Sequence, residues 1–234
     1  MTTAAIVPSA GRGERLGPGT PKALRPLGGV PMLVHAVRSL ARARSVDLVV
    51  VAAPEDFLDA VRMLLLDHEV GASVQVVAGG ATRQESVARA LSSLPAEVDV
   101  VLVHDAARPL VPPELVDAVA RRVRGGADAV VPGLPVTDTI KRIGPGSEVD
   151  ATVDRATLRA IQTPQGFRRS VLEKAHAEAD PVVLDVSDDA GLVELLGYPV
   201  LVVPGDEEGF KVTRPLDLVL AEAVLARRRS DGAN

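Results

Sequence analysis

Cysteine is absent from this 234-residue sequence, and aromatic residues make up only 2% of it. The absence of cysteine excludes disulfide bonds, thiolate metal ligands and thiol nucleophiles. The shortage of aromatic side chains leaves almost nothing on which nucleic-acid bases can stack. With a net charge of −5 and no long basic run, the chain also lacks the electrostatic footprint of a nucleic-acid-binding protein. We therefore expect no nucleic-acid partner, and any anionic ligand must be bound by a local cluster of cations and backbone N–H groups.

Long hydrophobic runs are also missing. None approaches the roughly 20 residues that a membrane-spanning helix needs, and residues 1–6 show neither the basic nor the apolar region of a signal peptide. We therefore expect a cytoplasmic protein with no membrane partner. Hydrophobic residues make up 47% and charged residues 24%, which is typical of a globular protein. No shift in composition marks a linker, so the sequence predicts a single domain over residues 1–234.

Short apolar runs rich in β-branched residues alternate with segments of helical periodicity, which is the pattern of an α/β fold. The run at 98–103 is apolar except at Asp99, as in a strand that is buried on both faces of a mostly parallel sheet. The sequence thus predicts a three-layer α/β/α sandwich whose ligands bind beyond the carboxyl ends of the strands. The predicted strands lie at residues 4–8, 48–52, 74–77, 98–104, 129–132 and 200–204, and helices are expected to begin near Pro31, Pro54, Arg83 and Pro113.

One segment interrupts this alternation. Residues 137–142 and 149–154 flank the turn sequence Gly144-Pro145-Gly146-Ser147, which predicts two strands and a turn that project from the sheet. We interpret the segment at about 137–155 as a dimerisation arm. At the other end, residues 227–234 are basic and then polar, which predicts a frayed terminus.

The most informative stretch follows the first predicted strand. It reads Pro8-Ser9-Ala10-Gly11-Arg12-Gly13-Glu14-Arg15-Leu16, with Pro21-Lys22 soon after. Small residues let backbone N–H groups approach phosphate oxygens, and Arg15 and Lys22 supply the positive charge that a triphosphate needs. The alternative is an ordinary glycine turn with two solvated cations. The spacing fits neither a Walker loop nor a full dinucleotide fingerprint. The pattern G-x-G-x-R, then P-K, resembles the nucleotidyltransferases with a sugar-phosphate cytidylyltransferase fold, and it would equally suit uridylyl-, guanylyl- and molybdopterin-type transferases.

A second candidate site, His104-Asp105-Ala106-Ala107-Arg108, ends the buried strand. An aspartate there faces the ligand crevice, and one carboxylate is enough for Mg²⁺, which keeps its waters and takes other ligands from substrate phosphates. Binding of another divalent cation at Asp105 is an alternative. A helix N-cap is the alternative role, but the helix near Pro113 begins too far downstream. We interpret His104 as a packed histidine, and the absence of a Gly-x-Ser-x-Gly elbow argues against a hydrolase.

A third motif, Gly79-Gly80-Ala81-Thr82-Arg83-Gln84-Glu85-Ser86, follows the third strand and opens a helix. The glycines permit close approach, and Ser86 is expected to hold its hydroxyl free for a base edge; a plain strand-to-helix turn is the alternative. Together, the three motifs resemble the 2-C-methyl-D-erythritol 4-phosphate cytidylyltransferases, which are enzymes of the non-mevalonate isoprenoid pathway. The resemblance continues, in the family's order, through residues 137–141, 153–155, 162–165 and 209–213.

The resemblance implies that the chain transfers CMP from CTP to 2-C-methyl-D-erythritol 4-phosphate and releases pyrophosphate. It implies catalytic roles for Arg15, Lys22 and Lys211, and Mg²⁺ binding by Asp105. The residues implied to contact the nucleotide are Pro8, Ser9, Ala10, Gly11, Gly13, Gly80, Ser86, Asp105 and Ala106. Those implied to contact the acceptor or the reacting phosphate are Asp105, Arg108, Thr139, Arg155, Thr163, Ser187 and Thr213. The family also implies a homodimer whose arms cross between subunits, so that Arg155 serves the neighbour's site.

The sequence departs from the family pattern in two places. Ser9 stands where many relatives have alanine, and Ala81 where some have an acidic residue; backbone contacts survive both changes. Two alternatives stay open at this point. One is a ribitol 5-phosphate cytidylyltransferase, although residues 137–141 and 162–165 look closer to the methylerythritol enzymes. The other is a catalytically silent nucleotide-binding module on the same fold.

Overall fold

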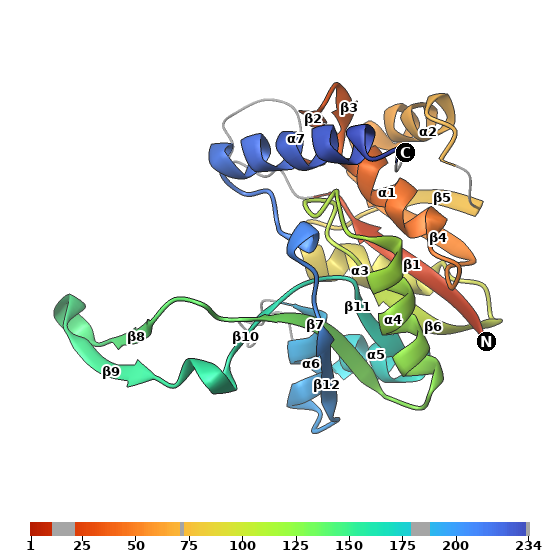
Figure 1. Ribbon diagram of the computed structural model, residues 1–234. Coiled ribbons are helices and arrows are strands. Elements are labelled where there is room, and N and C mark those ends of the chain that lie inside the picture. Colours follow the sequence, from red (N-terminus) through yellow and green to blue (C-terminus); the bar gives the residue numbers. More distant parts are fainter. Residues whose placement is uncertain (11–21, 71–72, 179–187, 233–234) are drawn as a thin grey trace.

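A mostly parallel eight-stranded sheet with helices on both faces carries the fold (Figure 1). The structure is a computed structural model, and it describes residues 1–10, 22–70, 73–178 and 188–232. The strand order is β10-β7-β11-β6-β1-β4-β5, and β12 pairs with β7. Strands β11 and β10 run antiparallel to their neighbours, and the remaining pairs are parallel. The strands of this sheet are β1 (Thr2–Pro8), β4 (Leu48–Ala53), β5 (Ser73–Ala78), β6 (Val98–Val103), β7 (Ala129–Pro135), β10 (Arg159–Ile161), β11 (Gln165–Arg168) and β12 (Val200–Pro204).

Helices flank both faces of the sheet, as the sequence predicts. The helices of the described ranges are α1 (Met32–Arg42), α2 (Leu58–Asp67), α3 (Arg83–Ser92), α4 (Pro113–Arg124), α5 (Arg169–Glu178), α6 (Asp189–Leu195) and α7 (Pro215–Ser230). Helices α1, α2 and α4 bury their apolar sides on one face of the sheet, and α3, α5 and α6 bury theirs on the other. Successive side chains of β1 point to opposite faces, so Val7 joins the first core and Ile6 the second. The predicted three-layer sandwich is thereby confirmed.

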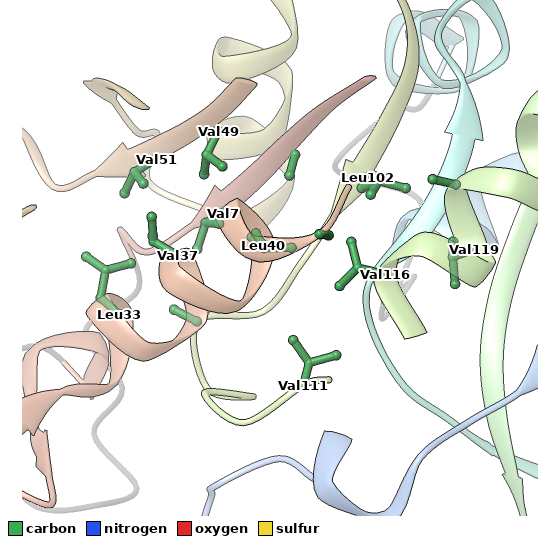
Figure 2. Close-up of a cluster of buried hydrophobic side chains, with 14 of the residues drawn as sticks. Val7, Leu33, Val37, Leu40, Val49, Val51, Leu102, Val111, Val116 and Val119 are labelled. Carbon is green, nitrogen blue, oxygen red and sulfur yellow. The ribbon is translucent and has the colours of Figure 1, made fainter. Parts of the chain in front are cut away.

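Buried valines and leucines fill the first of these cores. Figure 2 shows Leu33, Val37 and Leu40 of α1 close to Val7 of β1 and to Val49 and Val51 of β4. Val116 and Val119 of α4 face Leu102 of β6 in the same core. This packing fixes the central strands, because a well-packed core tolerates little change in side-chain volume.

Each predicted strand is present, and the central sheet also contains two strands that the sequence does not predict, β10 and β11. Strand β11 inserts between β6 and β7 and runs antiparallel to both. Its Gly166 is required by packing, since a Cβ at that position would lie 2.6 Å from Cγ1 of Val119. None of the helices in the described ranges is long and apolar enough to cross a membrane.

The segment at about 137–155 is a projecting hairpin, as the sequence predicts. Strands β8 (Ile140–Ile143) and β9 (Val149–Val153) pair antiparallel in a sheet of their own. The short 3-10 helices η4 (Pro145–Ser147) and η5 (Arg155–Thr157) lie at its tip and near its base. Figure 1 shows the hairpin extending well away from the central sheet.

Helix α7 lies across the carboxyl-end side of the sheet and packs against a small hairpin of β2 (Pro26–Leu27) and β3 (Val30–Pro31). The prediction of a frayed terminus is wrong for residues 227–230, which belong to α7. Arg227 and Arg228 both pair with Glu208 of the 3-10 helix η6 (Glu207–Gly209), and Arg228 also donates to the carbonyl of Leu110 at 2.7 Å. The remaining short elements are η2 (Lys22–Leu24) and η3 (Glu55–Phe57).

Candidate active site

A pocket opens at the carboxyl ends of β1 and β6, beside the turn that follows β5. In the described part of the chain it is lined by Pro8, Ser9, Ala10, Lys22, Ala23, Arg83, Ser86, Asp105, Ala106, Ala107 and Lys211. Most of the predicted nucleotide-binding and catalytic residues are therefore brought together. Gly11, Gly13, Arg15 and Ser187 lie outside the described residues.

The end of β1 is anchored to its neighbour by Ser9. Its backbone N–H donates to the carbonyl of Ala52 at 2.8 Å, and its hydroxyl donates to the same oxygen at 3.0 Å. Next to it, Ala10 packs so closely on Gly79 that a Cβ on Gly79 would lie 2.6 Å from that of Ala10. The glycine after β5 is thus needed for the approach of two loops, which its lack of a side chain permits.

The turn from Gly80 to Ser86 is closed by its own hydrogen bonds. The Ser86 hydroxyl accepts from the N–H of Gly80 at 3.0 Å and donates to the carbonyl of Thr82 at 2.8 Å. Thr82 caps α3 by accepting from the N–H of Glu85, and Glu85 accepts from the N–H of Ala81. The expectation that the Ser86 hydroxyl is free is therefore wrong. One lone pair remains, so this hydroxyl can accept one more hydrogen bond from a ligand.

Asp105 sits between two cations at the end of β6. Its Oδ2 lies 2.8 Å from Nζ of Lys211, and its Oδ1 lies 3.4 Å from Nε of Arg83, while its side chain is 13% exposed. Burial alone would raise the pKa of Asp105, but the charges of Arg83 and Lys211 outweigh it and hold that pKa well below its usual range. The pocket therefore presents an ionised carboxylate at neutral pH. Asp105 does not cap α4, whose N-cap is Pro112.

The backbone at Asp105 is held by a buried chain of hydrogen bonds. Its N–H donates to Oγ1 of Thr163 at 3.0 Å, and that hydroxyl lies 3.0 Å from Nδ1 of His104. His104 Nε2 contacts the carbonyl of Arg108 at 3.1 Å, which assigns the ring proton to Nε2 because a carbonyl only accepts. Burial lowers the pKa of His104 to about 4, so the ring stays neutral. His104 is a packed histidine, as predicted, and Thr163 is buried beside it.

The segment that carries Lys211 is held by the buried Gln162 and the partly buried Arg108. Gln162 donates from Nε2 to the carbonyl of Asp206 at 2.8 Å and accepts at Oε1 from the Asp206 N–H at 3.0 Å. Arg108 donates from Nη1 to the carbonyl of Gly209 at 2.8 Å and from Nη2 to that of Ile161 at 3.2 Å. In this structure Arg108, a predicted substrate contact, thus holds the backbone near Lys211. Gln162 belongs to the motif at residues 162–165, but nothing in that motif predicts this structural role.

Other predicted substrate contacts lie away from the pocket. Thr139 and Arg155 are exposed on the projecting arm, where Arg155 donates to the carbonyl of Thr137. Thr213 donates from both its N–H and its hydroxyl to Oδ2 of Asp217, at 2.7 and 2.8 Å, and so stabilises the start of α7. The single described chain does not bring these residues to Asp105.

Sequence reasoning also missed a charged group behind the pocket. Arg83 donates from Nη1 to Oδ2 of Asp189 at 2.6 Å, and His176 Nε2 lies 2.9 Å from the other oxygen of Asp189. Asp189 stands at the start of α6, and His176 lies on α5. The Asp188-Asp189 pair was the available signal, because two adjacent carboxylates before an apolar helix require partners.

The mostly parallel sheet and the pocket at its carboxyl edge, where Lys22, Lys211 and Asp105 line one cavity, define a nucleotidyltransferase-like α/β protein. The family model described as "IspD: 2-C-methyl-D-erythritol 4-phosphate cytidylyltransferase" matches residues 3–227. The chain belongs to this family, which confirms the resemblance seen in the sequence.

Relatives and solved structures agree with this assignment. The chain is 59% identical to a 2-C-methyl-D-erythritol 4-phosphate cytidylyltransferase of Streptomyces coelicolor, over 98% of this chain and 87% of that protein. It is 61% identical to one of Frankia casuarinae, over 96% and 81%. The crystal structure of the Thermus thermophilus enzyme of that name has a TM-score of 0.76 at 39% identity and covers 97% of this chain and 100% of its own.

We expect the neutral state of His104 to give the unliganded protein a specific pH dependence. In the unfolded chain His104 binds a proton below about pH 6.5, whereas in the folded protein its ring stays neutral down to about pH 4. The free energy of unfolding should therefore fall as the pH drops from 7 to 4.5, by about 2 kcal/mol from this residue. Carboxylates of ordinary pKa begin to take up protons only in the lowest part of this window, below about pH 5. Urea unfolding without divalent cations measures the loss.

The variant His104→Asn isolates this contribution. It should lose less stability than the wild type between pH 7 and 4.5, although it is less stable at pH 7. His68→Asn, on the partly exposed end of α2, serves as the control and should keep the wild-type slope. An unchanged slope in His104→Asn would show that the ring does titrate normally in the folded protein.

Proposed function

We propose that this chain transfers CMP from CTP to 2-C-methyl-D-erythritol 4-phosphate, giving 4-diphosphocytidyl-2-C-methyl-D-erythritol and pyrophosphate. The observation that carries the proposal is the pocket in which Lys22, Asp105 and Lys211 meet, in a chain that matches the family over residues 3–227. We also infer a cytoplasmic location, because CTP and a polyol phosphate are charged metabolites of the cell interior.

The reaction is an in-line attack at the α-phosphorus of CTP. A phosphate oxygen of the acceptor forms the new P–O bond, while the bond from the α-phosphorus to the bridging oxygen breaks and pyrophosphate leaves with the electron pair. The attacking phosphate is already anionic at neutral pH, so no strong general base is needed. In keeping with this, the described lining of the pocket contains no histidine. Catalysis then rests on positioning and on stabilising charge.

Lys22 and Lys211 have distinct roles in this scheme. Lys22, together with Arg15, neutralises the leaving pyrophosphate. Lys211 stabilises the charge that grows on the α-phosphoryl oxygens. Its side chain is 45% exposed and is held by Asp105, so it can exchange this partner for a phosphate when CTP enters. The backbone of its segment is meanwhile fixed by Gln162 and Arg108.

Magnesium fits the donor set at Asp105. The described residues contain no cluster of three or more His, Cys, Asp or Glu side chains, which argues against an all-protein metal cage. Mg²⁺ commonly binds through one or two carboxylates and completes its shell with water and phosphate oxygens. Asp105 offers such a carboxylate at the pocket. When bound, the ion would neutralise phosphate charge. The chain's own residues position the substrates and stabilise the charge that develops during the reaction.

We further propose a homodimer in which the arm reaches the partner's pocket. Ile143 and Val149 on the arm are 53% and 59% exposed, and the hairpin has no helix or sheet covering it in Figure 1. A two-stranded hairpin is marginally stable alone, so a second subunit would supply the missing packing. Such a dimer would also bring Thr139 and Arg155 to a pocket that their own subunit cannot offer them.

The acceptor and the nucleotide can be tested together by pyrophosphate release from purified protein with Mg²⁺. We expect release with CTP and 2-C-methyl-D-erythritol 4-phosphate, and little with UTP, GTP or ATP. Ribitol 5-phosphate should be a poor acceptor. Pyrophosphate release only with ribitol 5-phosphate would contradict the proposed acceptor but leave the mechanism unchanged. No release with any pair of substrates would favour a nucleotide-binding module.

Lys22→Ala and Lys211→Ala should each reduce kcat by about 100-fold or more, the range for the loss of one preorganised charge-stabilising donor. Lys174→Ala is the matched control, because Lys174 is an exposed lysine on α5 that pairs only with Glu178 and the ring of Tyr198 among the contacts described here. Steady-state kinetics, with the unfolding transition recorded for each variant, provide the measurement. Near-normal kcat in both pocket variants would contradict the assigned roles.

Mixing two inactive variants tests whether the arm crosses. Random pairing of Arg155→Ala with Lys211→Ala makes about half of the dimers mixed, and each mixed dimer has one complete site if Arg155 acts in the partner, so about a quarter of wild-type activity should return. Mixing Lys22→Ala with Lys211→Ala is the control, because both residues line one pocket of one chain, and it should restore nothing. No recovery with Arg155→Ala would place Arg155 in its own subunit's site or outside both.

A further inference from the structure

Arg83 joins the pocket to a buried carboxylate behind it. It stands in the first turn of α3, where its Nε lies 3.4 Å from Oδ1 of Asp105 and its Nη1 lies 2.6 Å from Oδ2 of Asp189. The Asp189 side chain is only 1% exposed, and it does not line the pocket. Arg83 therefore has one partner in the site and a shorter, more deeply buried contact outside it.

Asp189 is itself rigidly placed. It begins α6, whose N-cap Asp188 accepts from the N–H of Gly191 at 3.1 Å. Gln165 of β11 donates to Asp188 at 2.6 Å and accepts from the N–H of Ala190 at 3.2 Å. This pair of contacts fixes the start of α6 to the central sheet, and Asp189 with it.

The buried charge of Asp189 depends on two partners. Burial would raise the pKa of Asp189, but Arg83 and His176 outweigh burial and lower it, so the group is ionised. His176 is buried on α5 and reaches Asp189 through Nε2 at 2.9 Å, while its Nδ1 has no hydrogen-bond partner in the described part of the chain. A buried carboxylate that loses its cation is strongly destabilising. Arg83 is consequently tied to Asp189.

Lys211 and Arg83 differ in this respect. Lys211 is nearly half exposed, and among its described contacts it pairs with Asp105 alone, so it can turn to an entering phosphate. Arg83 cannot follow without leaving Asp189 buried and short of a cation. When Lys211 departs, Arg83 is the cation that remains beside Asp105.

We propose that Arg83 is a positioning residue: held by Asp189 and His176, it keeps the Asp105 carboxylate oriented into the pocket after Lys211 has turned to the nucleotide phosphates. This inference rests on the proposed function. It adds a chain of side-chain contacts that we call the relay. The relay runs from His176 on α5 and Asp189 on α6, through Arg83 on α3, to Asp105, the carboxylate that we propose binds the metal. The relay acts through Asp105, and Asp189 touches no ligand.

Asp189→Asn is the decisive variant because Asp189 is outside the pocket. We expect kcat to fall by about 10-fold or more, and Mn²⁺ binding to the protein–CTP complex to weaken by a similar factor, the range for residues that orient a metal ligand. The KM for CTP should change by less than about 3-fold, since no phosphate contact is lost. Electron paramagnetic resonance of free Mn²⁺ measures binding without an acceptor. Loss of Mn²⁺ affinity therefore supports the relay even if the acceptor proves wrong.

A matched control is available on the opposite face of the sheet. Asp117 on α4 accepts from the N–H and the hydroxyl of Ser45, at 2.9 and 2.6 Å, so Asp117→Asn also removes a hydrogen-bonded carboxylate. It should lower the unfolding free energy without changing kcat or Mn²⁺ binding. If Asp189→Asn changed both no more than Asp117→Asn does, the proposal would be overturned.

Substitutions at Arg83 keep the test informative if Asp189→Asn does not fold. Arg83→Gln should show the same pattern of low kcat, weak Mn²⁺ binding and little change in KM. Arg83→Lys, which keeps the charge but not the planar fork, should recover part of the loss. If Arg83 instead contacts the triphosphate directly, Arg83→Gln will raise the KM for CTP and leave Mn²⁺ binding intact, which contradicts a positioning role.

Discussion

The ionised carboxylate of Asp105 is the constraint on which the pocket depends. A charge that is largely removed from water must be paired, and its partners here come from distant segments of the chain. Arg83 is placed by the start of α3, and Lys211 by the segment after β12. The order of strands brings these segments together, because β1 and β6 are neighbours and their carboxyl ends open at one edge.

The supporting contacts divide the site into a fixed frame and a movable cation. Thr163 and His104 hold the backbone at Asp105, and Gln162 and Arg108 hold the backbone near Lys211. These contacts are buried or partly buried, where hydrogen bonds leave little freedom. The Lys211 side chain extends from this frame into the pocket, partly exposed and paired with Asp105. Such an arrangement suits a reaction that needs charge placed accurately but no proton removed from the nucleophile.

The sequence predicts those parts of the fold that are written in local patterns. Strands β4, β6 and β12 are short apolar runs rich in valine, and the glycine-rich turns stand directly after strands. The layered fold and the edge of the sheet that carries the pocket are therefore predictable. Strand β11 is not, because Gln165–Arg168 has only four residues and includes a glycine. It becomes a strand by pairing with β6 and β7, which is tertiary context overriding local preference.

The relay behind Asp105 cannot be predicted from the sequence, for a related reason. Arg83 and Asp189 are 106 positions apart, and no spacing rule connects them. Likewise, the roles of Gln162 and Arg108 depend on a fold that places Asp206 and Gly209 beside β10. Motif resemblance predicts which residues touch ligands. The residues that orient them become visible only when burial and charge pairing are known.

The arm places a further demand on assembly. Its strands pair only with each other among the described strands, and its apolar side chains at Ile143 and Val149 face solvent in one chain. Burying them against a second copy gains free energy at about 25 cal/mol per Å² of apolar surface. In the proposed homodimer, the contact between the arm and the partner subunit would both stabilise the hairpin and bring Arg155 to the partner's pocket. Folding of the arm, association of the subunits and completion of the site would then be one coupled event.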